Sequence, residues 1–122
     1  MSKVVLLVED NDFIRNMYQL KLAKADLMVI EAVDGKMALE KLEEQKPDIV
    51  LLDLMMPNVG GIEVLKALKK NNIIPNLPVI VLTNVMDPQT VALAKELGAR
   101  DYIVKTDLTP SQVVEKLEPF LK

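Results

Sequence analysis

The stretch IVLLD, residues 49–53, is apolar at every position until it ends in an aspartate. A strand that is apolar on both faces is typical of a parallel sheet covered by helices on both sides. Similar runs lie at residues 4–8 (VVLLV), 27–30 (LMVI) and 79–82 (VIVL), with a weaker one at 102–104 (YIV). We therefore expect five buried, parallel strands.

The segments between these runs carry helical periodicity. Two sets of apolar residues lie at i, i+4 and i+7, namely Phe13, Met17 and Leu20, and Val113, Leu117 and Phe120. Three further helices are marked less cleanly, by Ala38, Leu39 and Leu42, by Val64, Leu65 and Leu68, and by Ala94 and Leu97. Each gap between strands therefore holds one helix, and we expect its apolar face to belong to the core.

Five consecutive strand–helix units without an internal boundary predict one α/β domain over residues 1–122. Crossovers between parallel strands are right-handed, so helices on both faces require the strand order to reverse once. We expect a doubly wound, flavodoxin-like sandwich with a five-stranded sheet of order 2-1-3-4-5. Functional residues should then lie at the carboxyl ends of the first and third strands, where the order reverses.

Composition excludes several kinds of chemistry. The 122 residues include no cysteine and no histidine, which removes disulfides, thiol catalysis, Cys/His zinc sites and any mechanism based on imidazole. The net charge of −3 has the wrong sign for a domain that holds nucleic acid by its phosphates. No apolar run approaches the length of a membrane span. We expect a cytoplasmic protein whose partners are proteins or cations.

Charged and polar side chains follow four of the expected strands. Glu9 and Asp10 follow the first strand, Asp53 the third, Thr83 the fourth and Lys105 the fifth. Each has a simpler interpretation, because the first two could cap a helix, Thr83 could be an ordinary strand residue and Lys105 a solvated charge. Asp53 is harder to explain this way, since an unpaired charge at the mouth of a central strand is costly.

Taken together, these groups predict a cation site. Three carboxylates and one ammonium leave a net charge of −2, which one divalent cation would cancel. Oxygen ligands that are few in number suit Mg²⁺, which usually shares its site with a phosphoryl group. With Mg²⁺ and Lys105 in place, Asp53 could act as a nucleophile towards phosphorus.

The motifs resemble those of the receiver domains of two-component response regulators, and the resemblance covers essentially the whole chain. The matching residues are Glu9-Asp10, Asp53-Leu54-Met55-Met56-Pro57, Gly61, Thr83 and Tyr102-Ile103-Val104-Lys105. Any one motif is weak, but all of them in this order and at these separations are highly specific. We expect a stand-alone receiver that is similar to a chemotaxis regulator.

The resemblance implies a phosphoacceptor in a two-component phosphorelay. Asp53 would accept a phosphoryl group from the phosphohistidine of a sensor histidine kinase or of a histidine phosphotransfer protein. Mg²⁺ would be held by Asp10, Asp53 and the backbone carbonyl of Met55, with Glu9 acting through water. Such a domain is no enzyme in the usual sense, because it catalyses only its own phosphorylation and dephosphorylation.

The resemblance also implies a switch. Lys105 would pair with the Asp53 carboxylate and then with the phosphoryl oxygens, and Thr83 would hydrogen-bond to the phosphoryl group. Tyr102 would be the switch aromatic that turns inward when Thr83 moves. Phosphorylation adds charge and acceptor oxygens that need new donors, so we expect the surface of the fourth helix, fifth strand and fifth helix to change state.

Four positions depart from the family pattern. Thr106 follows Lys105 where receivers usually place proline, often after a cis bond, so the sequence leaves open how Lys105 is aimed. Asn84 follows Thr83 where a small residue is common, and either crowds the pocket or points to solvent. Met55 and Val85 occupy positions that tune loss of the phosphoryl group. Both are apolar and cannot orient water, so we expect a long-lived phosphorylated state.

Two other functions compete with this interpretation. A phosphatase that forms an aspartyl phosphate, as in the haloacid dehalogenase family, would need an acid two residues after Asp53, where this chain has Met55. A scaffold that binds a protein partner without phosphorylation is the main alternative. The intact acids, Thr83 and Lys105 count against the scaffold, while Thr106 and Asn84 favour it.

Overall fold

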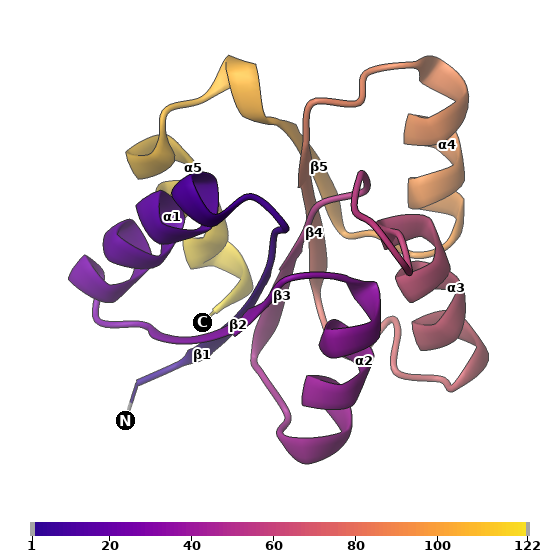
Figure 1. The fold of residues 1–122 in the computed structure, drawn as a ribbon, viewed down its shortest axis with the longest axis horizontal. Coiled ribbons are helices and arrows are strands. Elements are labelled where there is room, and N and C mark those ends of the chain that lie inside the picture. The colour runs from indigo at the N-terminus through magenta and orange to yellow at the C-terminus, as the bar shows by residue number, and fades with distance from the viewer. Residues whose placement is uncertain (1, 122) are drawn as a thin grey trace.

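The computed structural model describes residues 2–121, along which strands and helices alternate (Figure 1). The strands are β1 (Val4–Val8), β2 (Met28–Ala32), β3 (Ile49–Leu52), β4 (Val79–Thr83) and β5 (Asp101–Val104). The α-helices are α1 (Asp12–Lys24), α2 (Gly35–Glu44), α3 (Gly61–Lys70), α4 (Pro88–Glu96) and α5 (Pro110–Leu117). Two short 3-10 helices, η1 (Lys105–Asp107) and η2 (Glu118–Phe120), complete the described chain.

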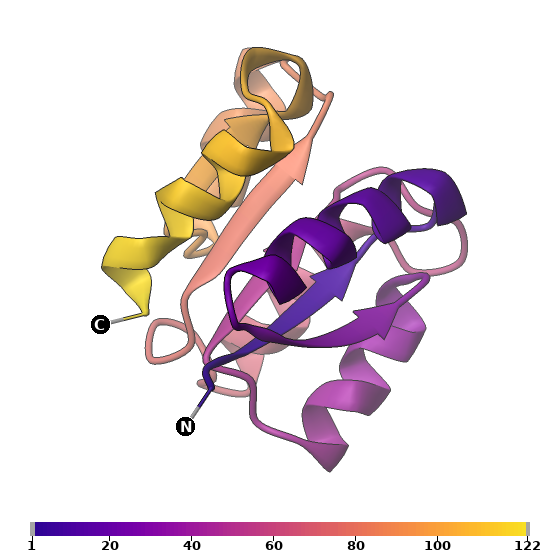
Figure 2. The same cartoon turned by 90° about the vertical axis from the view of Figure 1, so that its left-hand side faces the viewer.

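The strands form one parallel sheet of order β2-β1-β3-β4-β5, which confirms the predicted doubly wound α/β fold. Helices α1 and α5 cover one face of the sheet and α2, α3 and α4 cover the other (Figures 1 and 2). The order reverses between β1 and β3, so the crevice predicted at their carboxyl ends is present in the topology.

The central strands supply both cores. Leu6, Val50 and Leu52 pack beneath α2, α3 and α4, whereas Leu7 and Leu51 pack beneath α1 and α5. All five are buried, and burying each such side chain fully stabilises the fold by about 1.5–3 kcal/mol. Helices cover both faces of the sheet, so β1, β3 and β4 need apolar side chains on both of their faces, as the sequence predicted.

The predicted core face of α1 was wrong in part. Phe13 is 79% exposed and Leu20 is 59% exposed, although Met17 does pack against the core. The buried row is instead formed by Tyr18 and Leu22. Helix α1 carries two apolar rows on different sides, and only one of them can face a sheet that α1 shares with α5.

Element ends follow their local signals with one exception. Asp87 caps α4 before Pro88, Gly98 follows α4 with a φ of 108°, and Thr109 forms a reciprocal capping box with Gln112. The exception is β2, which begins at Met28 and continues through Glu31 to Ala32 because it pairs with β1 to its end. No helix within residues 2–121 is long and apolar enough to cross a membrane.

Candidate functional site

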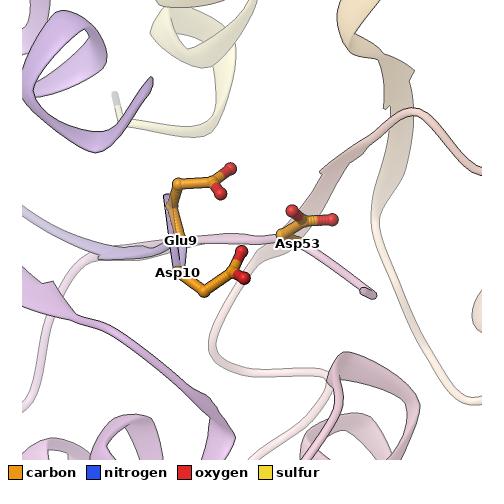
Figure 3. Close-up of side chains that lie close together, drawn as sticks. All are labelled: Glu9, Asp10 and Asp53. Atoms are coloured by element: carbon orange, nitrogen blue, oxygen red, sulfur yellow. The ribbon is translucent and has the colours of Figure 1, made fainter. Parts of the chain in front are cut away.

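Three carboxylates meet where the strand order reverses. Glu9 and Asp10 follow β1, and Asp53 follows the neighbouring β3, whose register places Leu52 beside Val8. Carboxylate oxygens of Glu9, Asp10 and Asp53 lie within 4.8 Å of one another. Figure 3 shows the Glu9 and Asp10 side chains leaving the end of β1 on the side of Asp53.

The alternative that these acids merely cap α1 does not hold. Asn11 is the N-cap residue, and its side chain accepts a hydrogen bond from the Ile14 amide at 2.9 Å. Glu9 is 3% exposed and Asp53 is 6% exposed, whereas Asp10 is exposed to solvent. Glu9 Oε2 accepts a hydrogen bond from the amide of this N-cap residue at 3.1 Å, but capping alone does not explain why two buried carboxylates and one exposed one share a small space.

Lys105 supplies the positive charge of this cluster. Its ammonium forms an ion pair with Glu9 and another with Asp53 Oδ2 at 3.0 Å. Ile74–Pro75 is the only cis peptide bond among residues 2–121, so the bond from Lys105 to Thr106 is trans. Lys105 therefore reaches Asp53 although Thr106 stands where receivers usually have proline and the bond before it is trans.

Burial and pairing act against each other on the ionisable groups. Burial raises the pKa of Glu9 above its usual range, although the hydrogen bond from Lys105 opposes this. Burial lowers the pKa of Lys105, but hydrogen bonds to Glu9 and Asp53 outweigh it and leave that pKa raised. Lys105 is therefore charged at neutral pH, and the three acids with one ammonium carry −2 when all are ionised.

The donor set fits a hard divalent cation. Asp53 Oδ1 accepts a hydrogen bond from the Met55 amide at 3.2 Å and Oδ2 accepts one from Lys105. Each carboxylate oxygen has two lone-pair sites, so both retain capacity for another ligand. Among residues 2–121, no donor hydrogen-bonds to the Asp10 carboxylate. Oxygen ligands, a net negative charge and an open side for water are what Mg²⁺ prefers.

Thr83 and Tyr102 lie on the strands beside the acids. Thr83 ends β4, is fully buried and accepts a weak hydrogen bond from the Val85 amide at 3.4 Å. The Tyr102 hydroxyl, on β5, donates to the Val85 carbonyl oxygen at 2.6 Å. Both side chains thus meet at Val85, in the loop between β4 and α4. Asn84 is exposed, in agreement with the interpretation that it points to solvent.

The structure also shows contacts that the sequence did not indicate. Arg15, on α1, donates from Nη1 to the backbone carbonyl oxygen of Glu9 at 3.0 Å. Asn58 Nδ2 donates to Asp34 Oδ2 at 2.9 Å, and the Gly35 amide donates to the Val59 carbonyl oxygen at 2.8 Å. The last two bonds join residues that are distant in sequence, and the first runs from a side chain to a backbone carbonyl, so periodicity and spacing could not have revealed them.

A cavity of about 430 Å³ lies away from this site. It is lined by residues that include Leu42, Pro47, Asp48 and Leu77, which precede β3 and β4 rather than follow them. The cavity therefore lies at the amino ends of the strands, opposite the acids.

Comparisons with known proteins agree with this geometry. The family model described as "Response regulator receiver domain" matches residues 5–118. The chemotaxis protein CheY of Thermotoga maritima is 42% identical over 123 aligned residues, which cover 100% of both chains. The chemotaxis protein CheY4 of Vibrio cholerae superposes with a TM-score of 0.90 at 30% identity, covering 99% of this chain and 100% of that one.

Longer regulators also match. The alkaline phosphatase synthesis transcriptional regulatory protein PhoP of Bacillus subtilis is 36% identical over 122 residues, which are 100% of this chain and 50% of that protein. The chain therefore spans the full length of some relatives and half the length of others.

Proposed function

The chain belongs to the response regulator receiver domains, which are phosphoacceptor signalling domains of two-component systems, and we propose that Asp53 is its phosphoacceptor. The observation that carries the proposal is the position of Asp53. Its carboxylate is buried, lies within 4.8 Å of the Glu9 and Asp10 carboxylates and bonds to Lys105. Receiver domains signal rather than turn over a substrate, so the phosphatase alternative is not needed and the scaffold alternative is not favoured.

The phosphoryl donor would be a phosphohistidine on a histidine kinase or histidine phosphotransfer protein. An Asp53 oxygen attacks phosphorus, the new O–P bond forms as the N–P bond breaks, and the imidazole leaves with the electron pair and takes up a proton. Asp53 is already an anion, so no general base is required, and positioning with charge neutralisation supplies most of the catalysis. The chain's catalysis would be confined to this step and to the hydrolysis of its own aspartyl phosphate, in which water attacks phosphorus and inorganic phosphate leaves.

The residues that would hold Mg²⁺ are Asp10, Asp53 and Met55 through its backbone carbonyl, with Glu9 acting through a water. The bond from Lys105 to Glu9 supports an outer position for Glu9, because the ammonium already occupies one of its oxygens. When bound, the cation would offset the negative charge that gathers between the carboxylates and the incoming phosphoryl group. Receiver domains typically bind Mg²⁺ at such an acidic pocket.

The response to phosphorylation would start at Thr83 and Lys105. The modified side chain carries about −2 instead of −1 and three additional acceptor oxygens. Thr83 ends β4, the strand beside β3, and Lys105 already bonds to Asp53 Oδ2. A shift of Thr83 would move Val85, whose carbonyl oxygen is bonded to Tyr102. The surface formed by α4, β5 and α5 would then be the one that a downstream protein recognises.

Two further properties are proposed with this function. Met55 and Val85 are apolar, and Met55 is 67% exposed, so neither orients a water for attack and the phosphorylated state should be long-lived. Residues 1–122 should act as a single receiver domain, which the family match over residues 5–118 supports.

Intact-mass spectrometry after exposure to acetyl phosphate and Mg²⁺ tests the proposal. The parent chain should gain the mass of one phosphoryl group, the Asp53→Asn variant should gain none, and a chelator should prevent the gain in the parent. An equal gain in parent and variant would place the modification elsewhere. If the parent gained no mass, the scaffold that binds a protein partner without phosphorylation would be favoured instead.

A further inference from the structure

We propose that Arg15 is a positioning residue that sets the direction of the Asp10 carboxylate and thereby the affinity of the site for Mg²⁺. The proposal rests on the proposed function, because it concerns the same cation. It is carried by the hydrogen bonds of a guanidinium that contacts neither Asp53 nor Lys105.

The Arg15 guanidinium joins three separate elements. Nη1 donates to the Glu9 carbonyl oxygen at 3.0 Å, Nε to Glu31 Oε1 at 3.2 Å and Nη2 to Asp12 Oδ1 at 2.6 Å. The side chain is 13% exposed, so it is packed between the loop after β1, the end of β2 and the first turn of α1. A planar fork with fixed donor directions can satisfy three such acceptors, whereas a lysine ammonium cannot hold the same geometry.

The bond from Arg15 to Glu9 matters because the Glu9 carbonyl directly precedes Asp10. It is part of the planar peptide unit between Glu9 and Asp10, and the orientation of this unit, together with the φ angle of Asp10, sets the direction in which the Asp10 side chain leaves the backbone. Glu9 itself is fixed at its other end, since its amide donates to the Ala32 carbonyl oxygen at 3.0 Å. On the other side of Asp10, the Asn11 amide donates to Glu9 Oε2 at 3.1 Å, so Arg15 holds this half of the turn together with that bond.

The Asp10 carboxylate has no hydrogen-bond donor of its own in the described chain, and the backbone of Asp10 is held by two bonds to Glu9, one from Arg15 to the Glu9 carbonyl oxygen and one from the Asn11 amide to the Glu9 carboxylate at 3.1 Å. Asp10 is also exposed. Its neighbours in the cluster differ, because Glu9 and Asp53 are both buried and bonded to Lys105. Loss of the Arg15 bond would leave this side of the turn held by the Asn11 amide alone, and binding of a cation would then have to order Asp10 further.

The two acids on Arg15 prevent it from competing with that cation. Asp12 and Glu31 form ion pairs with the guanidinium, so its charge is already balanced, and no ion pair joins it to Asp10 within residues 2–121. Arg15 can therefore orient the turn without occupying the carboxylate that it orients.

The test is a Mg²⁺ titration of the whole chain without any phosphoryl donor, followed by amide chemical shifts. Outer residues that orient metal ligands typically change metal affinity 10–100-fold, so Arg15→Ala should raise the Kd about tenfold. Arg15→Lys keeps the positive charge but loses the planar guanidinium, so its Kd for Mg²⁺ should lie between those of Arg15→Ala and the parent. At saturating Mg²⁺ the phosphorylation rate of Arg15→Ala with acetyl phosphate should approach that of the parent.

Arg100→Ala is the matched control. Arg100 also donates from a guanidinium to a backbone carbonyl oxygen, that of Pro75, at 2.7 Å, but it precedes β5 and lies at the opposite end of the sheet. Its variant should lose stability to urea without a change in Kd. The role of Arg15 is overturned if folded Arg15→Ala, or Arg15→Lys should the alanine variant not fold, binds Mg²⁺ as tightly as the parent. A parent that binds no Mg²⁺ would overturn the proposed function instead.

Discussion

Two halves of the site edge are held in place in different ways. The acid half comprises residues 9–11 and 53–60, and other elements tie it down through Arg15, Lys105 and the Gly35 amide. The switch half comprises residues 84–87. Within the described chain its bonds run to the adjoining elements, at Thr83 of β4 and Thr90 of α4, and to one element distant in sequence, through the bond from Tyr102 to Val85. A segment with few bonds to its surroundings rearranges at a lower free-energy cost.

This difference matches what each half has to do. The acid half must gather negative charge before any ligand arrives, and the cost of doing so is met by fixed donors around it. Under the proposed function, the switch half would adopt a second arrangement once the phosphoryl group is present, and its one hydrogen bond to β5 is a small barrier to that change.

The largest effect is expected for Lys105→Met in the acid half. Removal of the ammonium leaves Glu9 and Asp53 as buried carboxylates without a counter-charge, and breaking a buried pair in this way costs about 3 kcal/mol or more. Urea unfolding at neutral pH measures this loss. Saturating Mg²⁺ should recover part of it, because a bound cation restores positive charge to the cluster.

Lys95→Met is the control for that experiment. Lys95 is exposed on α4 and forms no ion pair among residues 2–121, so its removal should change stability little. If Lys105→Met proved as stable as Lys95→Met, the acid half would not depend on this ion pair.

A smaller loss of stability is expected for Gly35→Ala. Gly35 begins α2 and lies outside the acid half, but its amide bonds to Val59 within it. A Cβ at Gly35 would overlap the Val59 carbonyl, which also accepts the Gly35 amide hydrogen bond. Forcing an atom into such a contact costs about 2 kcal/mol. Urea unfolding should show the loss, and hydrogen exchange should show faster exchange across residues 53–60.

Gly60→Ala is the matched control, because a Cβ there would lie 3.3 Å from the Leu54 carbonyl oxygen and the backbone φ is −80°. That variant should lose less stability than Gly35→Ala, because a contact at 3.3 Å needs a shift of only a few tenths of an ångström. Equal losses in Gly35→Ala and Gly60→Ala would mean that the contact between Gly35 and Val59 does not hold the loop.

Tyr102→Phe should have an effect of about 1 kcal/mol on stability, since it removes one neutral hydrogen bond. Its consequence should be local to the switch half. Hydrogen exchange should quicken at residues 84–87 and stay unchanged at residues 53–60, which serve as an internal reference. Faster exchange in both segments would show that the two halves are not held independently.

The sequence was sufficient for the scaffold of both halves. Because β1, β3 and β4 are buried on two faces, their apolar runs revealed the strands, the reversal of order and the place where Asp53 and Glu9 meet. Parallel strands end at a common edge, so residues after different strands could be brought together without knowledge of loop conformation.

The sequence was insufficient where an element offers two solutions or where a bond crosses between elements. Helix α1 has two apolar rows, and periodicity gave no reason to prefer Tyr18 and Leu22 over Phe13 and Leu20. Arg15 reads as an ordinary helix residue, and nothing in its spacing indicates a bond to a backbone carbonyl. Glu31 extends β2 beyond its apolar run because β1 pairs with it there.

The smallest effect on stability is expected for Asp34 and Asp87, the acids that cap α2 and α4. Asp34 is bonded to the acid half, whereas Asp87 belongs to the switch half. Hydrogen bonds from the Met37 amide and from Asn58 hold the pKa of Asp34 below its usual range. Those from the amide and hydroxyl of Thr90 do the same for the pKa of Asp87. A carboxyl whose pKa is lowered by folding stabilises above its unfolded pKa of about 3.9 and loses that contribution as the pH falls through the folded value.

Asp34→Asn and Asp87→Asn isolate this contribution, because asparagine caps a helix about as well as aspartate. The urea midpoints of both variants should lie below that of the parent from pH 7 to about pH 5 and approach it below about pH 4.

The two variants should nevertheless differ in which loops they affect. Asp34 is bonded to Asn58 in the acid half, whereas the bonds to the Asp87 side chain come from its own helix. Asp34→Asn should therefore quicken hydrogen exchange at residues 57–60, while Asp87→Asn should leave every other loop unchanged, and identical exchange patterns would remove the distinction between the halves.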